Sequence, residues 1–294
     1  MTKFLGIEYG RGATKNINIA GPALAPRVIQ SMFPKGDWTI VTPDPLNILE
    51  ITNDRFGENY KIQQKIYKQT PYIQHIMIGG DHSVNFGHFA AIADHLNTDD
   101  LCLVYIDAHL DLHTPDSSKQ EASGAPHGTN VRALLGEGDS RWLGLPRRCP
   151  VLHPENLFYI ATRSFEPAEK EYALKQNINI NFDKDIKKSS DLDNIIHSIR
   201  QQIGSRPYIV SFDFDAIDPK YFSDVLVPES GGITFPMAKK LVKSFRDAYS
   251  FEFVEYSPTG NQKSRQIAQS LINILYQEKG KYNFYKHSHN LLCR

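Results

Sequence analysis

Acidic and imidazole side chains recur at short spacing in three motifs of this sequence. The motifs are Gly79-Gly80-Asp81-His82-Ser83, Asp107-Ala108-His109-Leu110-Asp111 and Ser211-Phe212-Asp213-Phe214-Asp215-Ala216-Ile217-Asp218-Pro219. Each motif directly follows an apolar run rich in β-forming residues. Residues two apart on a strand point to the same side, so Asp107, His109 and Asp111 can converge. The same spacing brings Asp213 and Asp215 together.

A group of carboxylates this dense requires positive charge, because like charges a few ångströms apart repel and would otherwise protonate. Divalent cations supply that charge. The candidate ligands are His82, Asp107, His109, Asp111, Asp213 and Asp215. This oxygen-rich set without thiolates favours manganese or another octahedral ion over structural zinc. Two such cations lower the pKa of a shared water toward neutrality, so hydrolysis is the expected reaction.

Each motif also has a structural interpretation, because Asp and His at strand ends often cap helices or satisfy loop backbone. Asp218, which precedes Pro219, is expected to act as such a cap and not as a ligand. All three motifs in this order, each behind its own strand, favour the two-metal interpretation.

In this order the motifs resemble those of the ureohydrolases, the family of arginase, agmatinase and their relatives. The resemblance covers nearly the whole chain, and the loop layout is closest to arginase. Weaker similarity lies in Gly21-Pro22 with Leu24 and Arg27, and in the segments Arg163–Glu169, Glu229–Thr234 and Val254–Pro258. The family's fold is an α/β/α sandwich, and its cofactor is two manganese ions per chain. We expect both here.

The resemblance also implies roles for individual residues. One manganese would be held by His82, Asp107, Asp111 and Asp213, and the other by Asp107, His109, Asp213 and Asp215, so that Asp107 and Asp213 bridge. Asp111 would accept a hydrogen bond from the metal-bridging hydroxide, and Glu255 would pair with the substrate guanidinium. His127 would be the proton shuttle to the leaving amine. Alternatively, His127 is a solvated loop histidine and Glu255 an ordinary strand-end glutamate.

The substrate end departs from arginase. His113 and Ala125 stand where arginase has asparagines that bind the substrate carboxylate, and alanine has no side-chain donor. Ser123 keeps the matching hydroxyl, Glu166 matches an acidic contact to the substrate amino group, and Thr234 lies in the substrate-side loop. A charged His113 could still attract a carboxylate.

The leading hypothesis is therefore a manganese amidinohydrolase that releases urea from L-arginine or a related guanidino compound. One alternative is an agmatinase- or guanidinobutyrase-type substrate. Another is a metal-dependent deacetylase, which would use one zinc and fewer carboxylates. The last is a family member that binds ligand without turnover.

Apolar β-rich runs and amphipathic stretches alternate along the chain. The expected strands are Phe4–Tyr9, Thr39–Val41, His75–Ile78, Leu101–Ile106, Leu157–Ala161, Tyr208–Phe212 and Phe251–Glu255. The expected helices are Glu58–Gln69, Val84–Leu96, Ala168–Gln176, Leu192–Ile203, Pro236–Ala248 and Ser264–Glu278. This alternation predicts an α/β fold with a mostly parallel sheet, helices on both faces, and ligands at the carboxyl ends of the strands.

Length and charge agree with a small-molecule enzyme. A chain of 294 residues can bury one α/β core, and we expect a single domain over 1–294. The formal net charge is zero, which argues against nucleic-acid and anionic-membrane partners. Three scattered cysteines, with neither a membrane span nor a signal-peptide core, indicate the cytoplasm. The segment 281–294 is expected to be a frayed tail or a subunit contact, and homo-oligomers are left open.

Overall fold

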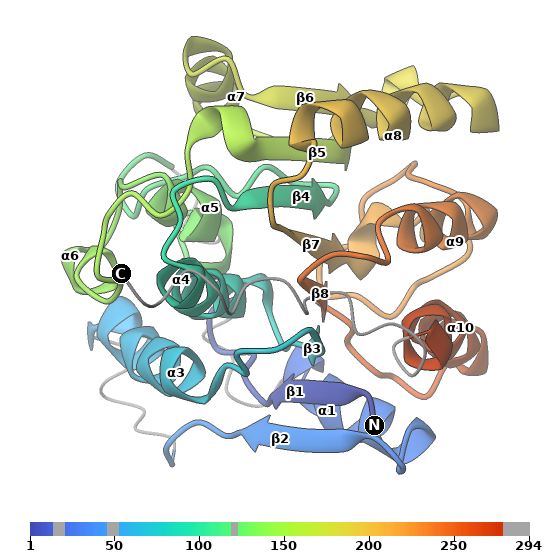
Figure 1. Cartoon of the computed structure of the whole chain (residues 1–294), viewed down its shortest axis with the longest axis horizontal. Helices are drawn as coiled ribbons and strands as arrows, with labels where there is room; N and C mark the ends of the chain where they lie inside the picture. The colour runs from blue at the N-terminus through green and yellow to red at the C-terminus, as the bar shows by residue number, and fades with distance from the viewer. Residues whose placement is uncertain (14–20, 46–52, 119–122, 279–294) are drawn as a thin grey trace, which may run out of the picture.

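The centre of the molecule is an eight-stranded sheet in which all neighbouring strands are parallel (Figure 1). The computed structural model describes residues 1–13, 21–45, 53–118 and 123–278. The strands lie in the order β2-β1-β3-β8-β7-β4-β5-β6. Their bounds are β1 (Lys3–Ile7), β2 (Asp37–Val41), β3 (His75–Ile78), β4 (Cys102–Ile106), β5 (Leu157–Thr162), β6 (Asn179–Phe182), β7 (Tyr208–Asp213) and β8 (Ser250–Val254). The predicted mostly parallel sheet is confirmed.

Helices cover both faces of this sheet (Figure 1). One face packs against α1 (Ala25–Met32), α8 (Ser189–Ile203), α9 (Phe235–Ser244) and α10 (Gln262–Glu278). The other packs against α3 (Arg55–Gln69), α4 (Asn85–Leu96), α5 (Asn130–Leu134), α6 (Ser140–Leu143) and α7 (Pro167–Lys175). Because both faces are covered, every residue of β3, β4, β5, β7 and β8 is buried. Continuous burial explains why these strands are mostly apolar in the sequence, and the polar residues within them, such as His75, Ser250 and Glu252, are buried as well.

One strand and the helices α1, α5 and α6 are absent from the predicted elements, and several predicted helix ends differ from the structure. The missed strand is β6, an edge strand in which polar Asn179 and Asn181 alternate with apolar residues and all four residues are only partly buried. The helix α3 begins earlier than expected, because the Asp54 carboxylate accepts a hydrogen bond from Gly57 N at 2.9 Å and caps it. The predicted tail 281–294 lies outside the described residues. None of the described helices is long and apolar enough to cross a membrane.

The strand order gathers the three motifs at one edge of the sheet. The strands β3, β8, β7 and β4 are consecutive neighbours in the sheet although they are far apart in the sequence. Asp107 and Glu255 directly follow β4 and β8, Asp213 is the last residue of β7, and His82 lies in the turn just after β3. Parallel strands end at the same edge, so residues from distant parts of the chain meet there.

The first motif needs a glycine at position 80. A side-chain Cβ on Gly80 would lie 1.5 Å from the Tyr9 carbonyl oxygen, and that oxygen already accepts a hydrogen bond from Asp81 N at 2.9 Å. We therefore expect Gly80→Ala to lower the free energy of unfolding by at least about 1–3 kcal/mol, since backbone must move. Urea unfolding measures this. The control is Gly138→Ala, whose Cβ would meet only ordinary contacts, the nearest at 3.4 Å. Equal stability of the two variants would contradict the prediction.

Candidate metal centre

Local backbone geometry orients three of the carboxylates. Asp107 Oδ1 accepts from His109 N at 2.6 Å, and Asp213 Oδ1 accepts from Asp215 N at 2.7 Å. Asp215 Oδ1 accepts from Ala108 N at 3.1 Å. In each case one oxygen is held by a backbone N–H at a strand end, so the other oxygen points toward an imidazole.

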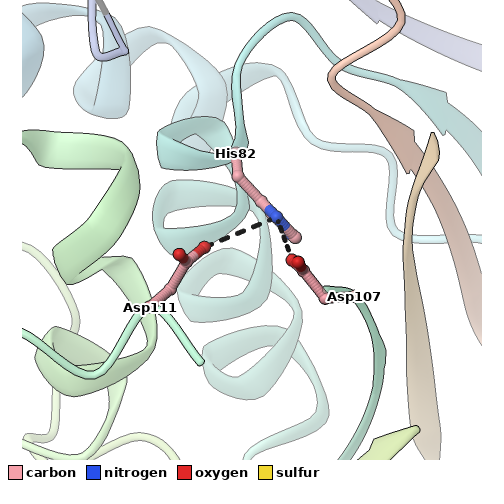
Figure 2. Close-up of side chains that lie close together, drawn as sticks. All are labelled: His82, Asp107 and Asp111. Atoms are coloured by element: carbon pink, nitrogen blue, oxygen red, sulfur yellow. Dashed lines mark ion pairs between the residues drawn. The ribbon is translucent and has the colours of Figure 1, made fainter. Parts of the chain in front are cut away.

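The first group of ligand atoms surrounds His82, which follows β3 (Figure 2). His82 Nδ1 lies 2.9 Å from Asp107 Oδ2 and 3.5 Å from Asp111 Oδ2. Asp213 Oδ2 lies 3.2 Å from the same nitrogen. The Ser211 hydroxyl, 2.9 Å from His82 Nε2, can accept the proton of that nitrogen and leave Nδ1 as the ligand atom.

The second group surrounds His109. His109 Nδ1 lies 3.0 Å from Asp215 Oδ2 and 3.5 Å from Asp107 Oδ1. In each of the sets His82/Asp107/Asp111 and Asp107/His109/Asp215, the ligand atoms lie within 4.8 Å of one another. Asp107 belongs to both sets. All six predicted ligands thus converge on one place.

The charge balance of this cluster fits bound cations. Asp107 Oδ2 is buried and has no hydrogen-bond donor among the described residues. Burial, and then repulsion from Asp107, raises the pKa of Asp111 to about 7. Burial, followed by repulsion from Asp215 and Asp107, also raises the pKa of Asp213 well above its usual range. Burial opposes protonation of His82 and His109, but the neighbouring carboxylates outweigh it and raise the pKa values of both. Two imidazoles can nevertheless balance only two of the four carboxylate charges. Divalent cations would provide the remaining positive charge.

A cavity of about 340 Å³ lies over the cluster. The six ligands line it together with the predicted residues His113, Ser123, His127, Glu166 and Glu255. Thr234 is not in this lining. Its hydroxyl accepts from Met237 N at 3.4 Å and caps α9 instead.

His127 and Glu255 are both held in defined orientations in the cavity wall. His127 Nδ1 lies 3.2 Å from the Gly12 carbonyl, which can only accept, so Nδ1 carries the proton and Nε2 has the lone pair. Burial, followed by the positive charge of Arg55, lowers the pKa of His127 to about 3, so the free ring is neutral. Glu255 Oε1 accepts from His82 N at 2.8 Å. Burial and the nearby Asp81 raise the pKa of Glu255 well above its usual range.

Comparison with known proteins agrees with this geometry. A family model described as the arginase family matches residues 15–278. The chain belongs to the arginase family. It is 29% identical over 283 residues to an arginase of Staphylococcus aureus, covering 91% of this chain and 89% of that protein. The crystal structure of arginase from Bacillus subtilis is 25% identical, covers 94% of this chain and 98% of that one, and has a TM-score of 0.77.

A more distant neighbour shares the arginase-family fold. The agmatine ureohydrolase of Thermoplasma volcanium is 21% identical, with a TM-score of 0.66 over 96% of this chain and 90% of that one. The chain is thus a hydrolase of a family that acts on guanidino and amidino compounds and typically depends on manganese. The predicted family and reaction class are confirmed.

The cavity of this family member also contains a residue to which the sequence analysis gave no role of its own. Glu229 Oε1 lies 3.5 Å from His109 Nε2 and accepts from the Ser164 hydroxyl at 3.0 Å. It therefore lies against the ring nitrogen opposite the one that faces Asp107 and Asp215. A carboxylate in this place orients a ligand histidine. Its only sequence signal was its position at the start of the segment Glu229–Thr234.

Proposed function

We propose that the protein is a two-manganese amidinohydrolase that releases urea from a guanidino compound. The position of Asp107 is the observation that carries this proposal. Asp107 belongs to both ligand sets, and the cavity above these sets also contains His127 and Glu255. Two cations bound there would supply Lewis acidity and an activated water. The remaining steps fall to side chains of the chain itself.

Glu255 is the proposed partner of the substrate guanidinium. A planar guanidinium pairs well with a carboxylate, and the bond from His82 N fixes how this carboxylate faces the cavity. A cationic partner would also offset the cost of its burial. We assign Asp111 the role of accepting a hydrogen bond from the attacking water. We assign His127 Nε2 a proton relay, since Nδ1 is committed to Gly12: its lone pair would first accept the proton that the attacking water releases, and Nε2 would then donate that proton to the leaving amine.

At the end of the cavity that contains His113 and Glu166, the contacts of the side chains disfavour binding of a substrate carboxylate. His113 is 2% exposed, its Nδ1 is 3.0 Å from the Ser117 hydroxyl, and its Nε2 is 3.2 Å from Glu169 Oε2. Burial opposes protonation of His113, but the bond to Glu169 outweighs it and raises the pKa. The charge of this imidazole is therefore balanced by Glu169. Among the described residues that line the cavity there is no lysine or arginine.

We infer that the preferred substrate lacks a carboxylate at this end, as agmatine does, and that L-arginine is a weak substrate. Glu166 lines the same cavity, where an acidic side chain suits an amino group. The direct test is urea release by manganese-loaded protein from L-arginine, agmatine and guanidinobutyrate. Efficient turnover of L-arginine would contradict the inference about the carboxylate. No urea from any guanidino compound would contradict the proposed function.

A double substitution tests how this end of the cavity recognises a carboxylate. His113 lines the cavity, whereas Ala125 is 2% exposed and lies outside the lining, two residues before the lining residue His127. His113→Asn with Ala125→Asn should raise activity on L-arginine relative to agmatine by roughly tenfold to a few hundredfold. The reason is that each charge-assisted hydrogen bond is worth about 1.5–3 kcal/mol. Steady-state kcat/KM for both compounds gives the ratio. The control is His113→Leu, which removes the pair with Glu169 and adds no donor. An unchanged ratio in the double variant would refute the assignment.

A further inference from the structure

Asp111 is oriented by side chains, whereas backbone N–H groups orient Asp107, Asp213 and Asp215. Asp111 Oδ2 accepts from the Tyr105 hydroxyl at 2.6 Å and from Asn130 Nδ2 at 3.0 Å. The backbone of Asp111 has φ of 51°, a left-handed conformation that is uncommon for a residue with a side chain. Strained backbone of this kind persists where the surroundings fix it.

Tyr105 contacts two ligands of the first group at once. It lies two residues before Asp107 on β4, so its side chain is on the same side of the strand as that of Asp107. Its ring stacks on the His82 imidazole, with centroids 4.4 Å apart and planes 8° from parallel. Its hydroxyl lies 3.0 Å from His82 Nδ1 while it donates to Asp111. One fully buried tyrosine thus sets the orientation of a histidine and a carboxylate relative to each other.

Asn130 joins the metal centre to the segment that carries His127. It begins α5, three residues after His127, and its side chain folds back onto the preceding turn. Its Nδ2 donates to the His127 carbonyl at 2.6 Å as well as to Asp111, and lies 3.3 Å from the Tyr105 hydroxyl. A carbonyl and a carboxylate only accept, so the amide nitrogen must be the atom that faces them. Asn130 is fully buried, which excludes competing solvent.

We propose that Tyr105 and Asn130 are positioning residues of the metal centre, and that Asn130 also ties the His127 backbone to Asp111. The inference rests on the proposed metal centre but not on the identity of the substrate. Partners that orient a ligand typically change metal affinity 10–100-fold when they are removed. Because both residues bond to the same oxygen, their effects are not independent.

The test measures manganese affinity of metal-free protein by competition with a chelating dye, so it does not depend on activity. Tyr105→Phe and Asn130→Leu should each weaken binding of at least one ion about 10–100-fold. The double variant should lose less than the product of the two factors. Tyr105→Phe keeps the stacked ring, so it carries the test if Asn130→Leu does not fold. The matched control is Tyr208→Phe, which removes a hydroxyl that donates to Asp247 at 2.6 Å from the amino end of β7.

A second readout separates positioning from a general loss of stability. At saturating manganese, Tyr105→Phe should recover most of its kcat. Asn130→Leu should keep a reduced kcat with nearly unchanged KM, because the His127 backbone has lost its tie to Asp111. Affinities within twofold of the parent protein in both variants, or equal weakening in Tyr208→Phe, would overturn the proposal. A parent protein that binds no manganese would refute the metal centre itself. Tight binding without urea release would refute only the proposed reaction.

Discussion

Asp107→Asn should remove both manganese ions and reduce urea release to background. Asp107 belongs to both ligand sets, and its Oδ2 is buried without a hydrogen-bond donor among the described residues. The amide oxygen of asparagine can still accept from His109 N, so the strand end should fold as before. The lost charge, however, leaves neither cation with a complete set of carboxylates. Metal analysis of the purified variant, alongside its thermal unfolding, gives the result.

Two further variants make the metal prediction specific. Asp215→Asn should weaken mainly the ion at His109, because Asp215 Oδ2 lies 3.0 Å from that ring and belongs to one set only. Asp218→Asn is the control from the same motif: Asp218 forms an ion pair with Lys220 at 2.5 Å and should leave both ions in place. Asp213 is also expected to bridge, so Asp213→Asn should resemble Asp107→Asn. Loss of a single ion in both bridging variants would contradict the shared-ligand arrangement.

His127→Ala should lower turnover about 10²–10⁴-fold while manganese content and folding stay nearly intact, which is the usual contribution of a positioned acid or base. His127 lines the cavity, its Nδ1 is held by the Gly12 carbonyl, and Nε2 remains for proton transfer. Initial rates of urea release, measured with saturating manganese and the preferred guanidino compound, provide the test.

The control for His127 is a histidine outside the cavity. His197 is exposed on α8, so His197→Ala should leave the rate unchanged. If His127→Ala turns over at the parent rate, His127 does not transfer the proton. If manganese content falls instead, His127 supports the metal centre. In that case the metal centre would depend on two contacts of His127: the one between its ring and the Gly12 carbonyl, and the one between its own carbonyl and Asn130.

The residues that meet in the candidate metal centre could be picked out of the sequence because several independent signals coincide at them. Central strands covered on both faces are mostly apolar, so an Asp or His directly after an apolar run marks a strand end. Parallel topology then places all these ends at one edge. The edge strand β6 gives no such signal, because its alternating asparagines and apolar residues match a partly exposed stretch of any kind. Burial on both faces, more than strand propensity, made the sheet predictable.

The finer contacts could not be predicted because they depend on residues distant in sequence. Nothing in the sequence near His113 indicates that Glu169 pairs with it. Thr234 illustrates a different limit, since a threonine that caps a helix and one that contacts a substrate have the same local sequence context. Tyr105 lies within an apolar run, where an aromatic residue usually indicates only core packing. Its hydrogen bond to Asp111 becomes visible only in three dimensions.

The candidate metal centre and the residues assigned to the reaction lie at the carboxyl edge of the sheet. None of them lies at the amino edge. The turn between α8 and β7, with exposed Gly204 and Ser205, is at that opposite edge. Loops there connect elements without lining the cavity, so they tolerate attachment better than loops near the ligands. A surface tether or a fused reporter placed at Ser205 would hold the enzyme with its cavity facing away from the support. Because all the strands run in the same direction, the residues of the candidate site lie at one edge of the sheet, and the opposite edge is suited to attachment.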